Sequence, residues 1–119
     1  MQESTAAGYA DGDWQAAFDA VGTGVLILDA NLNVLRSNRA LAAWLGTSPA
    51  GAAGRACYEL VHNRDTPPPG CPACYALRSH HEEHLEQEVP SMGGYYRCSA
   101  CPIIEGGIVQ RIVVAVDDL

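Results

Sequence analysis

Hydrophobic and polar residues alternate with two different periods along this chain. Apolar residues recur at helical spacing over residues 14–21, which predicts a short helix from Trp14 to about Val21 with Asp13 as its cap. Residues 1–12 are small and polar, so we expect a flexible N-terminus before a folded domain of residues 13–119. Two aliphatic runs, Val25–Leu28 and Val34–Ser37, flank the turn residues 29–31 and predict a β-hairpin.

The pattern changes to helices in the middle of the chain and returns to strands at its end. A helix, a short helical turn and a longer helix are predicted over residues 38–45, 57–62 and 71–84, with loops over 46–54 and the proline-rich 66–70. Three further strands are predicted over residues 84–89, 95–104 and 108–116. Their hairpin-length links indicate an antiparallel sheet, and the whole order predicts an α+β fold.

The amino-acid composition excludes some classes of function. The 119 residues are 48% hydrophobic and 18% charged, which is typical of one globular domain. The net charge is −7 and every basic residue is Arg, so we expect no nucleic-acid binding by this segment. No apolar run is long enough for a transmembrane helix, and residues 1–12 lack the pattern of a signal peptide. We therefore expect a cytoplasmic domain, excised from a longer protein and not bound to a membrane.

Short sequence features spread over residues 14–118 resemble the PAS family when they are taken together in order and spacing. They are Ala20–Asp29, Asn38-Arg39-Ala40, Leu45-Gly46, Gly54-Arg55, Ser99–Ile103 and Asp117, although Asp118-Leu119 departs from the usual exit motif. The resemblance implies a PAS fold, a five-stranded antiparallel sheet with short helices packed on one face. It also implies a bacterial sensory domain that regulates an attached kinase, cyclic-nucleotide enzyme or transcription regulator, as in two-component systems.

The resemblance places a ligand pocket between the sheet and the helices. Alternation along the strands puts residues 96, 98 and 100 on one face, together with residues 112, 114 and 116. A core filled by side chains, without a cavity, is the alternative. The expected pocket residues are Leu26, Leu28, Leu41, Trp44, Leu45, Tyr58, Val61, Leu77, Tyr96, Cys98, Ala100, Ile112 and Val114.

Four residues form the sharpest chemical cluster. Cys71 and Cys74 are three positions apart at a predicted helix start, and Cys57 and His62 lie one loop away. Three thiolates and one imidazole suit a tetrahedral zinc site. Redox chemistry at Cys71 and Cys74, or free thiols that pack as small apolar groups, are the alternatives.

Other cofactors fit the sequence less well. Cys98 and Cys101 repeat the Cys-x2-Cys spacing, but residues three apart in a strand point to opposite faces, which argues against a zinc ribbon or an iron–sulfur cluster. A flavin is disfavoured because the polar residues that would follow Cys57 are missing, and haem bound by a helical histidine is also disfavoured. No nucleophile and base occur together, so we expect no enzyme activity.

Two functions from different classes follow. The first is a sensor that binds a small apolar molecule, or that responds to thiol or metal state. The second is an interaction module without ligand, in which the N-terminal helix with Trp14 and Phe18 forms a homodimer.

Overall fold

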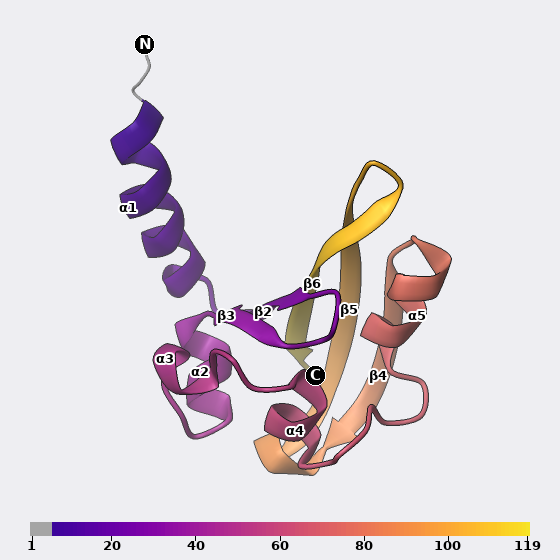
Figure 1. Cartoon of the computed structure of the whole chain (residues 1–119). Helices are drawn as coiled ribbons and strands as arrows, with labels where there is room; N and C mark the ends of the chain where they lie inside the picture. The colour runs from indigo at the N-terminus through magenta and orange to yellow at the C-terminus, as the bar shows by residue number, and fades with distance from the viewer. Residues whose placement is uncertain (1–5) are drawn as a thin grey trace.

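Five antiparallel strands form one sheet in the order β3-β2-β6-β5-β4 (Figure 1). The computed structural model describes residues 6–119. Strands β2 (Gly24–Asp29) and β3 (Val34–Ser37) form the first hairpin, whereas β4, β5 and β6 follow the helical segment. The bounds of these three are Glu83–Val89, Gly94–Glu105 and Ile108–Asp118. The predicted α+β fold with five antiparallel strands is confirmed.

Most helices are short, and four of them lie between the two groups of strands. These are α2 (Arg39–Trp44), α3 (Pro49–Ala52), α4 (Cys57–His62) and α5 (Pro72–Ser79), whereas the 3-10 turn η1 (Pro90–Met92) joins β4 to β5. The longest helix, α1 (Ala6–Ala20), precedes β2 and extends away from the body of the molecule (Figure 1). None of the helices described here combines the length and hydrophobicity that a membrane crossing requires.

Three predicted boundaries were wrong, each for a local reason. Helix α1 already runs through Asp13, which was expected to cap it. The predicted loop over 46–54 contains α3, because the Ser48 hydroxyl accepts a hydrogen bond from the Gly51 N–H and caps a turn that begins with Pro49. Helix α5 ends at Ser79 rather than near His84, because His80 adopts a left-handed backbone conformation with φ 62°.

Alternation along the strands divides the sheet into an inner and an outer face. On β2, Leu26 and Leu28 are buried, whereas Val25 and Ile27 are only partly buried. The same alternation buries the residues that were predicted to face inward on β5 and β6, namely Tyr96, Cys98, Ala100, Ile112, Val114 and Val116. Helices α2 and α5 pack on this inner face, so the core lies between one layer of sheet and one layer of helices.

A fully buried asparagine fastens the N-terminal part of this helical layer to the sheet. Asn38 caps α2 by accepting a hydrogen bond from the Leu41 N–H at 3.1 Å, and its side-chain oxygen also accepts from the Val25 N–H of β2. Its amide nitrogen donates to the carbonyls of Phe18 and Thr23 at 3.1 and 2.8 Å. One side chain therefore joins the end of α1, the start of β2 and the start of α2.

A glycine at the start of β2 lets α2 approach the sheet closely. A Cβ atom at Gly24 would lie 2.9 Å from the Trp44 ring and 3.1 Å from Leu41. The absence of a side chain at this position therefore brings α2 against the inner face.

Candidate functional site

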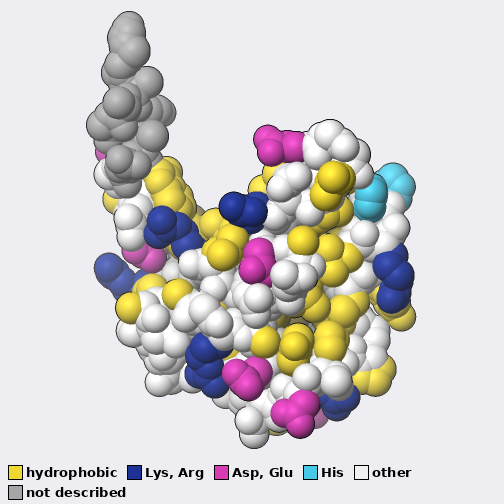
Figure 2. All heavy atoms as spheres, viewed as in Figure 1, with side chains coloured by type: hydrophobic (Ala, Val, Ile, Leu, Met, Phe, Trp, Pro, Cys, Tyr) yellow, Lys and Arg dark blue, Asp and Glu magenta, His cyan; other side chains and the backbone are white. Residues whose placement is uncertain are grey.

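A cavity of about 50 Å³ lies between the inner face of the sheet and the short helices. Hydrophobic side chains gather on the corresponding surface between α4 and α5 (Figure 2). Every strand except β3 contributes to the wall, together with α2, α4, η1 and the start of α5. The lining residues are Leu26, Leu41, Cys57, Val61, His62, Cys71, Pro72, Ala73, Gln87, Met92, Cys98, Val114 and Val116.

Some of the residues expected in a pocket line this cavity, and the rest pack around it. Leu26, Leu41, Val61, Cys98 and Val114 belong to the wall. The others lie in the surrounding core without lining the cavity, either buried (Leu28, Tyr96, Ala100, Ile112) or partly buried against it (Trp44, Leu45, Tyr58, Leu77).

Sequence reasoning did not assign several wall residues to the pocket. Alternation along β4 could have added Gln87, which lies two positions from the buried Val89. Val116 was predicted to face inward but was not among the expected pocket residues. Met92 carries no such signal, because it lies in η1, a turn that was not predicted. The thiols of Cys57 and Cys71 were expected to bind metal, yet they form part of the cavity wall.

Several sulfur-containing side chains line the cavity. Cys57 from α4, Cys71 before α5 and Cys98 from β5 all line it, as does the thioether of Met92. Cys74 does not line the cavity, but it lies close enough to Cys71 for that thiol to help raise its pKa. All five cysteines are free. The fold therefore brings four cysteines from three separate segments into one region.

Burial keeps several of these thiols protonated. It raises the pKa of Cys57 to about 12, with smaller contributions from the neighbouring thiols of Cys71, Cys98 and Cys74. Burial also raises the pKa of Cys74 to about 11, aided by Cys71. The pKa of Cys98 is raised by burial as well, although a hydrogen bond with Gln87 opposes the shift. At neutral pH these three sulfurs are neutral and weakly polar.

His62 adds the one imidazole of the wall. Burial lowers its pKa, and the positive charge of Arg64 lowers it further. The ring is therefore neutral at neutral pH and can donate or accept one hydrogen bond at the cavity edge.

The four residues that were expected to bind zinc lie near one another but do not form a coordination site. Cys57, His62 and Cys71 share the cavity, and Cys74 lies close to Cys71. Within residues 6–119, however, no three His, Cys, Asp or Glu side chains are arranged to hold a metal ion. Cys98 is buried and Cys101 is exposed, as expected for residues on opposite faces of one strand.

A larger hollow next to α1 differs from this cavity in its surroundings. It measures about 320 Å³ and is lined by residues of α1, β3 and α3, among them Phe18, Leu35 and Arg36. Leu35 and Arg36 are exposed, so this hollow is a surface groove beside α1. The smaller cavity is enclosed by core residues and is the better candidate for a ligand.

On the outer face of the sheet a serine contacts a histidine. His84 lies opposite Ser99 on the neighbouring strand β4. The Nδ1 atom of His84 is 3.1 Å from the Ser99 hydroxyl, and its Nε2 atom is 3.8 Å from a Glu82 carboxylate oxygen. The His84 and Glu82 side chains are 48% and 52% exposed, and none of the three residues lines a hollow described above. The contact therefore acts as a cross-strand pair on an open surface.

Comparison with known proteins identifies the family. Residues 18–119 match the family described as "PAS fold". No curated protein sequence was found to match the chain.

Solved structures with the same fold come from signalling proteins. The photoactive yellow protein domain of the sensor histidine kinase Ppr from Rhodospirillum centenum has a TM-score of 0.68 and 21% identity, over 93% of this chain and 98% of that domain. The PAS domain of nitrogen regulation protein NR(II) from Vibrio parahaemolyticus has a TM-score of 0.69 and 16% identity, over 88% and 96%. The Vibrio cholerae VqmA dimer, a LuxR-type receptor, has a TM-score of 0.66 and 18% identity, over 90% of this chain and 50% of that one.

Proposed function

Because the chain belongs to the PAS family, we propose that it is a sensory module whose thiol-lined cavity binds a small apolar ligand and regulates a covalently attached output domain. The observation that carries the proposal is the cavity itself, enclosed between sheet and helices and lined mainly by aliphatic and sulfur-containing side chains. Solved neighbours from a sensor histidine kinase and a LuxR-type receptor support a signalling role.

The size and chemistry of the wall define the ligand class. A volume of about 50 Å³ has room for a few non-hydrogen atoms. The neutral thiols and the neutral imidazole of His62 offer no charge to an ionic ligand. The ligand is therefore a small, uncharged and largely apolar molecule.

The wall also offers a route by which ligand binding could affect the rest of the domain. Val114 and Val116 belong to β6, and Leu26 belongs to β2, which directly follows α1. The Thr23 hydroxyl donates a hydrogen bond to the Asp117 carboxylate at 3.0 Å, so the start of β2 and the end of β6 are joined. A ligand that favours one packing of these strands raises the population of that packing. The segments before β2 and at the end of β6 then change position with the strands.

Xenon is a suitable probe, because it is apolar, uncharged and monatomic. We expect xenon to shift the backbone amide resonances of the wall residues in a two-dimensional NMR spectrum. Ala73→Val fills the cavity and should remove the shifts. Ala115→Val, on the outer face of β6, should leave them in place. Equal shifts in both variants, or no shifts in the parent chain, would contradict ligand binding at this cavity.

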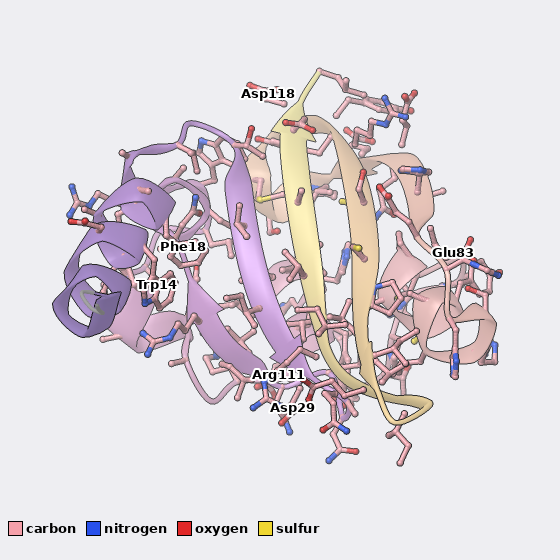
Figure 3. The ribbon with its side chains drawn as sticks, turned by 90° about the horizontal axis from the view of Figure 1, so that it is seen from above. Trp14, Phe18, Asp29, Glu83, Arg111 and Asp118 are labelled. Atoms are coloured by element: carbon pink, nitrogen blue, oxygen red, sulfur yellow. The ribbon has the colours of Figure 1, made fainter. Side chains whose placement is uncertain are left out.

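A homodimer through α1 is a second function, and the surface of that helix favours it. Trp14 is 39% exposed although it contacts Phe18 and lies under the Arg36 guanidinium. Figure 3 shows both aromatic rings on the side of α1 that faces the sheet. If this surface joins two copies, Trp14→Ala should convert a dimer to a monomer in light scattering and leave the xenon shifts unchanged. A monomeric parent chain would rule the dimer out.

A further inference from the structure

Two of the clustered cysteines lie close together. Cys71 is the N-cap residue of α5, and Cys74 lies three residues further on in its first turn. The Cys71 carbonyl accepts a hydrogen bond from the Tyr75 N–H at 3.1 Å, so the helical turn already begins at Cys71. The Cys71 thiol is near enough to help raise the pKa of Cys74. Both residues are partly buried, so a small oxidant can reach them from solvent.

The position of the two cysteines at a helix start suits a disulfide. The side chains of the N-cap and third helical positions lie next to each other at a helix start, which is the arrangement that a capping box uses. Neighbouring side chains of one helical turn have Cβ atoms about 5–6 Å apart. A disulfide needs Cβ atoms about 3.5–4.5 Å apart. Rotation of both side chains, with a closing of the turn by about 1–2 Å, would therefore join the sulfurs.

We propose that Cys71 and Cys74 form a reversible disulfide under peroxide, and that this bond controls the shape of the adjacent cavity. The second half of this proposal rests on the ligand-binding function proposed above. The first half concerns the thiol pair alone and stands without it.

The oxidation balances with hydrogen peroxide as the oxidant. The Cys71 sulfur, after its thiol releases a proton, attacks one peroxide oxygen; the O–O bond breaks, and the departing hydroxide takes up that proton and leaves as water. The Cys71 sulfur is now a sulfenic acid. The Cys74 sulfur displaces the sulfenic oxygen, which takes up the Cys74 thiol proton and leaves as a second water, and the S–S bond forms. The two thiols together lose two protons and two electrons, and a thiol reductant such as glutathione reverses the reaction.

The other cysteines are less suited to this bond. Cys57 and Cys98 come from α4 and β5, so their sulfurs meet across the cavity rather than within one turn. Cys101 is exposed on the face of β5 opposite to Cys98. The proximity of Cys71 and Cys74 therefore selects this pair.

Oxidation should change the cavity because Cys71 belongs to its wall and Cys74 does not. To form the bond, the Cys71 sulfur turns toward Cys74 and leaves part of the wall open. The first turn of α5, which also contributes Pro72 and Ala73 to the wall, is then held by a covalent link. Xenon should bind the oxidised chain at least a few fold more tightly than the reduced chain.

Peptide mapping provides a direct test, because trypsin separates the cysteines into three groups. Cleavage after Arg64 and Arg78 places Cys71 and Cys74 alone in peptide 65–78, whereas Cys57 lies in 56–64 and Cys98 and Cys101 lie in 98–111. After peroxide treatment and alkylation, we expect peptide 65–78 to lose the mass of two hydrogen atoms and to carry no alkyl group. Dithiothreitol should restore two alkylation sites.

Single variants sharpen the test. Cys71→Ser and Cys74→Ser should each abolish the modified peptide, whereas the matched control Cys101→Ser should retain it. A disulfide between peptides 56–64 and 98–111, or an unmodified peptide 65–78 while other cysteines are oxidised, would contradict the proposed disulfide between Cys71 and Cys74. A disulfide that forms without changing xenon affinity would overturn only the link to the cavity. No xenon binding in either state would count against the ligand function and leave the disulfide established.

Discussion

The two halves of the helical layer are attached to the same sheet in different ways. Around Asn38, three segments are joined by hydrogen bonds with fixed directions, and the side chain is fully buried. Around the cavity, α4 and α5 contact the sheet through aliphatic and sulfur-containing side chains that leave about 50 Å³ unfilled. A hydrogen-bonded junction has one favoured geometry, whereas an apolar wall with spare volume can be repacked at small cost. We therefore expect the region around Asn38 to keep one packing and the region around the cavity to change its packing.

The largest effect is expected at the fixed junction. Asn38→Ala removes the cap of α2 and the acceptor of the Val25 N–H, and it leaves two carbonyls without their donor. The free energy of unfolding should fall by about 2–4 kcal/mol in urea denaturation. Asn31→Ala, at an exposed turn position, is the control and should cost less than about 0.5 kcal/mol. Equal losses in the two variants would contradict the role given to Asn38.

A smaller loss of stability is expected when a larger side chain is introduced, and this loss should differ between the two regions. Ala42 is 1% exposed on α2 and does not line the cavity, whereas Ala73 is 4% exposed and lines it. Ala42→Val should destabilise the chain by about 1–3 kcal/mol through overpacking. Ala73→Val adds its methyl groups to empty space, so its cost should stay within about 0.5 kcal/mol, as measured by the same denaturation. The comparison fails if Ala73→Val is the more damaging change.

At neutral pH the smallest effect is expected from the cavity thiols, because their ionisation changes the stability only as the pH rises above 9.0. In the folded chain the pKa of Cys74 is raised from 9.0 to about 11, and that of Cys57 to about 12. Below pH 9.0 both thiols are neutral in the folded and unfolded chains, so the stability they contribute is fully present. Between pH 9.0 and about 11 the unfolded chain ionises first, so stability is lost as the pH rises.

This dependence can be measured by urea denaturation at neutral pH and again between pH 9.0 and about 11. A double variant, Cys57→Ser with Cys74→Ser, should lose less stability over that interval than the parent chain. Cys101→Ser, on the other face of β5, should lose as much as the parent. A double variant that follows the parent would show that these thiols are not responsible.

Local sequence signals predicted the strands, and the alternation of side chains along a strand predicted the inner face. Burial alternates throughout β2, over residues 96–100 of β5 and over residues 112–116 of β6. Local signals also located the start of α2 at Asn38, a residue type that caps helices. The links from Asn38 to Phe18 and Thr23 could not be predicted, because they join positions 20 and 15 residues apart through backbone carbonyls.

The candidate site was predictable only in part for a related reason. Cys71 and Cys74 form a local pattern, so their proximity could be inferred from spacing. The arrival of Cys98 beside Cys57 depends on how α4 packs over β5, and no local signal encodes that packing. The His84 contact with Ser99 likewise depends on the register between β4 and β5.

The central position of β6 has a consequence for how the domain is made. Strands β2 and β5 each pair with β6, and β2 and β5 do not pair with each other. During synthesis, the β2–β3 and β4–β5 hairpins therefore remain separate until residues 108–118 have left the ribosome. Until then the backbone N–H and C=O groups along the free edges of β2 and β5 are unpaired, and other chains can bind there. The domain should therefore complete its fold only after β6 has emerged, and a chain stopped at Gly107 should remain as two hairpins without a common sheet.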